Sequence, residues 1–176
     1  MYLKRTRTLG LKFKPNPSKG FKDYVDADFS GLWNRIEAPT DPSTAKSRAG
    51  WIIFYAGCPI IWASRLQTQV SLSTTEAEYI ALSMSLRDVI PALELVTEVT
   101  SHGCKVLCSE PELARLPKFR PRTKHINVAW HHFRDHARQG LIKFFPCSTE
   151  DMVADVLTKP LPQNPFVKHR IKMMGD

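Results

Sequence analysis

The acidic side chains that could hold a divalent cation lie in separate parts of the sequence. Asp26 and Asp28 are two residues apart at the end of a short apolar-polar alternation, so in a β-strand both carboxylates would project from one face. Carboxylate oxygens are preferred ligands of Mg²⁺, which commonly takes only one or two of them from a protein. The pair therefore predicts part of a cation site that other acids complete. The alternative is a turn, because Asp also favours the ends of strands.

Glu76 and Asp155 are two further candidates, and each has a competing explanation. Ser73-Thr74-Thr75-Glu76 has the spacing of a capping box, in which the Glu side chain bonds back to the backbone of the N-cap residue. Asp155 follows Asp151 by one helical turn, and like charges at this spacing destabilise a helix unless a cation lies near them. A metal ion or a basic side chain would supply that cation.

The elements that would position these acids are indicated by hydrophobic periodicity. Residues 21–25, 50–54 and 60–63 are β-branched or aromatic runs, and a turn at residues 57–59 separates the last two. From Ser73 onwards, apolar residues recur every three to four positions, which predicts a long amphipathic helix that Pro91 should kink or split. Further strands are expected at 104–108 and 141–145, with a helical region at 123–140 between them and a short helix at 148–157.

The length and charge of the chain suggest one domain with basic ends. A chain of 176 residues with 43% hydrophobic residues can bury a core. The net charge is +8, and basic residues dominate the stretch before the first acid. We expect a basic linker at 1–19, a folded domain at 20–158 and a basic, proline-broken tail at 159–176. Such a charge distribution suits nucleic acid, and the alternative is a solvated charged tail.

The sequence has no membrane-spanning or secretory pattern. It has no run of eighteen apolar residues, and its first residues lack the apolar stretch of a signal peptide. We therefore expect a soluble, intracellular protein with no membrane partner.

Several motifs together resemble one family, the ribonuclease H (RNase H) domains of copia-type retrotransposon polyproteins. In order along the chain they are Tyr24-Val25-Asp26-Ala27-Asp28 followed by Gly31, Ser47-Arg48-Ala49-Gly50, Ile61-Trp62-Ala63-Ser64, Ser73-Thr74-Thr75-Glu76-Ala77-Glu78-Tyr79-Ile80-Ala81-Leu82, Arg122-Thr123-Lys124-His125-Ile126 and Ala154-Asp155-Val156-Leu157-Thr158-Lys159-Pro160-Leu161-Pro162. The first residues, Tyr2 to Leu11, resemble the end of the preceding reverse transcriptase region.

The resemblance implies an α/β fold of the RNase H type, a mixed five-stranded sheet with three antiparallel strands, two parallel additions and flanking helices. It implies catalytic, metal-binding roles for Asp26, Glu76 and Asp155, with Asp28 as a substitute for Asp26. The implied cofactor is a pair of Mg²⁺ ions, with Mn²⁺ as an alternative, and the implied reaction is cleavage of the RNA strand of an RNA–DNA hybrid. The reverse transcriptase domain of the same polyprotein is the implied partner, in a cytoplasmic virus-like particle or in the nucleus.

The sequence departs from the family pattern at the fourth acid. The family places an Asp-Asn pair at the end of the strand predicted at 104–108, where this chain has Ser109 and Glu110. Glu110 is the nearby acid that could replace the missing Asp, but the predicted site is impaired. Arg122 and Lys124 are expected to contact phosphates, and the alternative is a helix N-terminus that Thr123 caps. The alternative function is a nucleic-acid-binding relic of the same fold without turnover.

Overall fold

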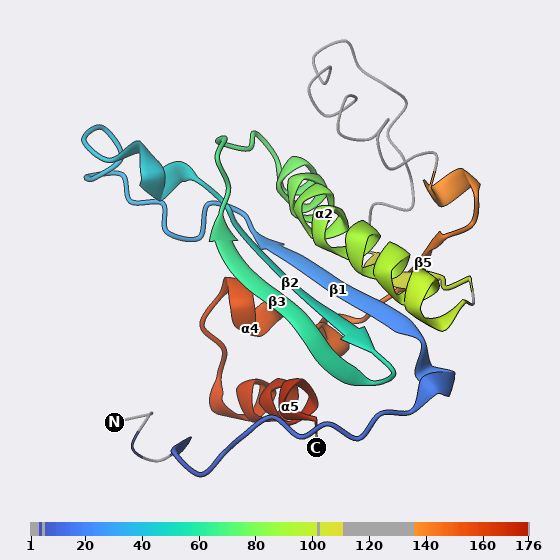
Figure 1. The fold of residues 1–176 in the computed structure, drawn as a ribbon. Helices are drawn as coiled ribbons and strands as arrows, with labels where there is room; N and C mark the ends of the chain where they lie inside the picture. The colour runs from blue at the N-terminus through green and yellow to red at the C-terminus, as the bar shows by residue number, and fades with distance from the viewer. Residues whose placement is uncertain (1–3, 5, 102, 111–135, 176) are drawn as a thin grey trace.

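The computed structural model describes residue 4 and residues 6–101, 103–110 and 136–175. A five-stranded sheet in the order β3-β2-β1-β4-β5 forms its centre (Figure 1). The strands are β1 (Phe21–Asp28), β2 (Arg48–Tyr55), β3 (Cys58–Leu66), β4 (Val106–Glu110) and β5 (Ile142–Pro146). The first three pair antiparallel, whereas β4 runs parallel to both β1 and β5. This mixed sheet with flanking helices confirms the predicted RNase H-like α/β fold.

The hairpin between β2 and β3 turns earlier than predicted. Ala56 and Gly57 both have positive φ, 52° and 80°, as the two central residues of a tight hairpin turn require. Cys58 and Pro59, which the prediction placed in the turn, already belong to β3 and pair with β2. Pro59 is tolerated there because β3 is an edge strand of the sheet.

The long helix α2 (Thr74–Thr100) covers one face of the sheet. Its apolar stripe packs against β1 and β2 around the fully buried Trp51. Pro91 does not split this helix, which runs unbroken past it. Pro91 has no N–H, so the carbonyl of Arg87, four residues earlier, lacks its usual hydrogen-bond donor in the helix. Both residues lie on the exposed side of α2. The buried face therefore keeps its packing.

The C-terminal elements α4 (Asp155–Thr158) and α5 (Gln163–Met174) lie on the opposite face (Figure 1). The predicted helix at 148–157 is wrong, because a 3₁₀ turn at Thr149–Asp151 ends before α4 begins. Asp151 and Asp155 are therefore not on successive turns of one helix. Asp151 instead pairs with Lys168 of α5 at 3.1 Å.

Residues 12–16 contact the end of α5 and the hairpin turn of the sheet. Residues 159–176, expected as a proline-broken tail, contain the twelve-residue helix α5. The backbone N–H of Lys12 donates to the carbonyl of Met174 at 2.7 Å, and that of Asn16 donates to the carbonyl of Ala56 at 2.7 Å. Within the described residues, no helix is long and apolar enough to cross a membrane.

Candidate active site

Asp26 and Asp155, two of the predicted ligands, meet between β1 and α4. Asp26 lies in β1 opposite Gly50 of β2. A Cβ on Gly50 would come within 2.7 Å of Thr158 Cγ2 and 2.8 Å of Leu157 Cβ. Because such distances are sterically forbidden, the glycine is what allows α4 to approach the sheet closely enough to bring Asp155 to Asp26.

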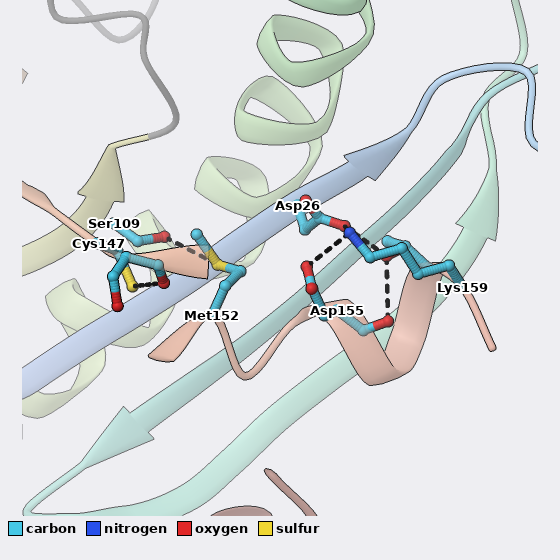
Figure 2. A network of polar contacts seen from close by, with 8 residues as sticks. Asp26, Ser109, Cys147, Met152, Asp155 and Lys159 are labelled. Carbon is cyan, nitrogen blue, oxygen red and sulfur yellow. Dashed lines mark hydrogen bonds and ion pairs between the residues drawn. The ribbon is translucent and has the colours of Figure 1, made fainter. Parts of the chain in front are cut away.

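The two carboxylates share a contact with Lys159 (Figure 2). The hydroxyl of Thr158 donates to Asp26 Oδ2, and the two carboxyl groups are within hydrogen-bonding reach of each other. Lys159 Nζ lies 3.1 Å from Asp155 Oδ1 and 3.8 Å from Asp26 Oδ2. One ammonium group therefore lies close to both acids and offsets part of their negative charge.

The charges at this site shift the pKa values of Asp155 and Lys159. Burial raises the pKa of the Asp155 carboxyl, and the negative charge of Asp26 raises it further, whereas Lys159 opposes both effects. Burial alone would lower the pKa of Lys159, but the two carboxylates outweigh it and leave that pKa raised. The pair thus favours any cation placed between its oxygens.

Glu76 takes part in the cap of α2. Its backbone N–H donates to Ser73 Oγ at 3.1 Å, and its Oε2 accepts from the N–H of Leu72 at 2.8 Å, one residue before the expected N-cap partner. No group of three or more Asp, Glu, His or Cys side chains that could hold a metal occurs among the described residues. The structure thus joins Asp26 with Asp155 but does not add Glu76, whose catalytic role stays a prediction.

Ser109 lies on this face of the sheet at the end of β4, where the resemblance expects an acid (Figure 2). It is fully buried, its Oγ accepts from the N–H of Val25 at 2.9 Å, and it lies 3.9 Å from Met152 Sδ. Glu110 is the last residue of β4, but its side chain lies outside the described part of the structure. Arg122 and Lys124 also lie outside it.

Asp28, the proposed substitute for Asp26, faces the loop that follows β1. A Cβ on Gly31 would fall 2.4 Å from the carboxyl carbon of Asp28, so this glycine leaves room for the carboxylate. The structure also assigns contacts to Thr158 and Lys159, which the sequence analysis quoted in a motif without giving them a role. They come three and four residues after Asp155, a spacing that places side chains next to each other on a helix, so the sequence could have indicated these contacts.

Asp23, which the sequence analysis did not consider as a site residue, is the most strongly perturbed acid of β1. It is fully buried on the α2 side, where Ser85 Oγ donates to its Oδ2 at 2.7 Å. Its Oδ1 has no nitrogen or oxygen partner among the described residues. Burial raises the pKa of this carboxyl to about 7, although the hydrogen bond from Ser85 acts to lower it.

Comparisons with known proteins identify the origin of the chain. It is 35% identical over 150 residues to the retrovirus-related Pol polyprotein from transposon TNT 1-94 of Nicotiana tabacum, a match that covers 82% of the chain. It is 31% and 29% identical to the corresponding polyproteins from transposons RE2 and RE1 of Arabidopsis thaliana, over 94% of the chain in both cases. The chain is homologous to one segment of the copia-type retrotransposon Pol polyproteins. It spans only 11% of the length of each of these relatives.

No family model and no solved structure matches this Pol segment. Its candidate site is therefore defined by its own geometry. Two carboxylates face a single cation, which here is the ammonium group of Lys159. Since Mg²⁺ commonly uses one or two protein carboxylates and keeps several waters, this donor set fits one divalent ion.

Proposed function

We propose that this Pol segment is an RNase H that cleaves the RNA strand of RNA–DNA hybrids. The observation that carries the proposal is the meeting of Asp26 and Asp155 around one cation. The two acids come from motifs at opposite ends of the chain, and the close approach of α4 to Gly50 brings them together. The RNase H-like sheet and the kinship with Pol polyproteins support the same function.

In this proposal Asp26 and Asp155 hold a Mg²⁺ ion, or Mn²⁺ in its place. Glu76 and Glu110 are the acids nominated for a second ion. Bound Mg²⁺ ions supply an activated water and stabilise the charge that develops on the leaving oxygen. Thr158 orients the Asp26 carboxylate through its hydrogen bond, and Lys159 offsets part of the charge of the pair before metal binding. Lys159 therefore competes with a metal for the same oxygens.

A second candidate function is nucleic-acid binding without turnover. It is favoured by Ser109, which lies buried on the face of the sheet where the family places an acid. A catalytic constellation that misses one ligand loses about a hundredfold or more in rate.

The proposed substrate and surroundings follow from the same kinship. The partners would be an RNA–DNA hybrid and the reverse transcriptase domain of the same polyprotein. The location would be a cytoplasmic virus-like particle or the nucleus. Lysine and arginine side chains would bind the phosphates, and the 2′-hydroxyl would distinguish the RNA strand.

The decisive experiment measures cleavage of a labelled RNA–DNA hybrid by the purified chain with Mg²⁺, with Mn²⁺ and with a chelator. We expect metal-dependent cuts in the RNA strand only. The same hybrid with Asp26→Asn protein is the control for a contaminating nuclease. A protein that binds the hybrid but leaves it intact with either metal would favour the second candidate function.

A further inference from the structure

A second charged site lies on the same face of β1, at the start of the strand. It is a cavity of about 380 Å³ between the N-terminal segment, the β2–β3 turn and the end of α5. Lys22 lines it, four residues before Asp26 in β1, so the two sites are about 13 Å apart along the strand at ~3.3 Å per residue. The cavity is thus separate from the carboxylate pair.

Positive charge dominates this cavity, which we call the lysine pocket. Its described lining residues include five lysines and no acid, and the lysines are Lys12, Lys14, Lys19, Lys22 and Lys172. The structure gives Lys14, Lys19 and Lys22 no ion pair with any carboxylate of the described residues. Uncompensated like charges repel one another, so a polyanion that enters the pocket relieves this repulsion.

Specific contacts build the pocket from both ends of the chain. The hydrogen bonds of Lys12 to Met174 and of Asn16 to Ala56 tie the N-terminal segment to α5 and to the hairpin turn. A Cβ on Gly175 would fall 1.9 Å from the carbonyl oxygen of Lys12, so the approach of the two segments requires a glycine there. Figure 1 shows the N-terminal segment passing along α5 to the start of β1.

Aromatic rings form the floor of the lysine pocket and hold one of its lysines in place. Tyr24 and Phe54 are buried and pack edge to face, with ring centroids 5.8 Å apart. Lys172 Nζ lies 4.4 Å from the centroid of the Tyr24 ring and 3.1 Å from its hydroxyl oxygen. One cation is thus positioned by the fold, and the others reach in on flexible stems.

We propose that the lysine pocket binds the phosphate groups of a nucleic-acid strand. Lysines are point charges that recognise phosphates without reading a sequence, as a general nuclease domain needs. The choice of nucleic acid over a free polyphosphate rests on the proposed function, because the pocket lies on the face of β1 that also carries Asp26. The pocket anchors the strand away from the carboxylate pair and does not require hydrolysis.

The test measures hybrid binding in chelator, where cleavage is impossible. The pocket variant is Lys14→Gln/Lys19→Gln/Lys22→Gln. The control variant, Lys46→Gln/Lys105→Gln/Lys143→Gln, has the same net charge but changes lysines outside the lining. Binding of an RNA–DNA hybrid is measured from low to high salt, and thermal unfolding of both variants verifies that they fold.

We expect the pocket variant to raise Kd about tenfold or more near 0.15 M salt, and to reduce the slope of log K against log salt by about 2 to 3. The control variant should retain most of the slope. Equal losses in the two variants, or no loss in either, would overturn the pocket as a site.

Inorganic tripolyphosphate distinguishes the two sources of phosphate. We expect it to displace the hybrid from the unmodified protein only at high concentration, and to compete less well against the pocket variant. Tight tripolyphosphate binding that the pocket variant loses, together with unchanged hybrid binding, would overturn nucleic acid as the ligand. A protein that binds hybrid through the pocket but cleaves nothing with Mg²⁺ would refute the proposed function and leave this inference standing.

Discussion

Two aspartates of β1 have opposite surroundings although they are three residues apart. Asp23 projects toward α2, where it is fully buried with Ser85 beside it and has no ion pair with a cation of the described residues. Asp26 projects toward α4, where Thr158, Lys159 and Asp155 contact its carboxylate or share its cation. The odd spacing places them on opposite faces of the sheet. The faces differ in what covers them, so Asp23 has only a buried hydroxyl contact on its face, whereas Asp26 has a cation near it.

The largest expected effect is on stability and concerns Asp23. Its pKa in the folded protein, about 7, exceeds the ordinary 3.8, so the folded state keeps a proton that the unfolded chain loses. The stabilisation is full below pH ~4 and is lost as pH rises through about 7, by at most about 4 kcal/mol. We expect the free energy of unfolding of the natural protein to fall by this amount relative to that of Asp23→Asn as the pH rises, because Asn has no proton to lose. Denaturant titrations from pH 4 to 8 measure it, and a constant difference would contradict the burial argument.

The next effect is on activity and concerns Asp26. Asp26→Asn should lower Mg²⁺-dependent hybrid cleavage by about a hundredfold or more, because it removes a charged ligand while keeping the shape of the side chain. Binding of the hybrid in chelator should stay within about twofold. Asp28→Asn is the matched control on the same face and should retain more activity. Cleavage that survives Asp26→Asn would show that the activity comes from elsewhere.

Lys159 permits a smaller test of the carboxylate pair. Lys159→Met keeps an apolar stem but removes the ammonium that lies between Asp26 and Asp155. Without metal the variant should lose only about 1 kcal/mol of stability, because the Lys159 side chain is partly exposed and solvent screens its ion pairs. Added Mg²⁺ should then raise its melting temperature more than that of the natural protein. The same Mg²⁺ response in both proteins would mean that the ion does not bind between these oxygens.

Glu76 should show the smallest effect on stability, and its test separates cap from ligand. Glu76→Gln can keep the hydrogen bond to the N–H of Leu72, so we expect a loss of only a few tenths of a kcal/mol. If Glu76 is also a ligand, hybrid cleavage should nevertheless fall about a hundredfold. Unchanged cleavage would leave Glu76 as a capping residue alone.

Glu110→Gln applies the same reasoning to the proposed replacement acid at the end of β4. A fall in metal-dependent cleavage with unchanged stability would support Glu110 as a ligand. Unchanged cleavage would exclude it, and the Asp26→Asn protein provides the background rate for this comparison.

The positions of the strands along the chain, the antiparallel hairpin and the start of α2 could be predicted from the sequence, because each depends on local periodicity and on turn or cap chemistry. The capping role of Glu76 could be predicted for the same reason, since its partners are within four residues. The meeting of Asp26 with Asp155 was accessible only through the resemblance of two motifs to a family. No local pattern relates residues so far apart in the chain.

Tertiary packing decided the remaining features. Pro91 continues α2 because its neighbours bury their side chains against the sheet, and the segment before Asp155 breaks because Met152, Val153 and Ala154 pack under β1 and β2. The burial of Asp23 depends on α2 covering one face of the sheet, and the lysine pocket depends on both chain ends meeting there. Sequence determines which residues can form an element, whereas the dielectric surroundings and charge partners of a side chain are set by segments distant in the chain.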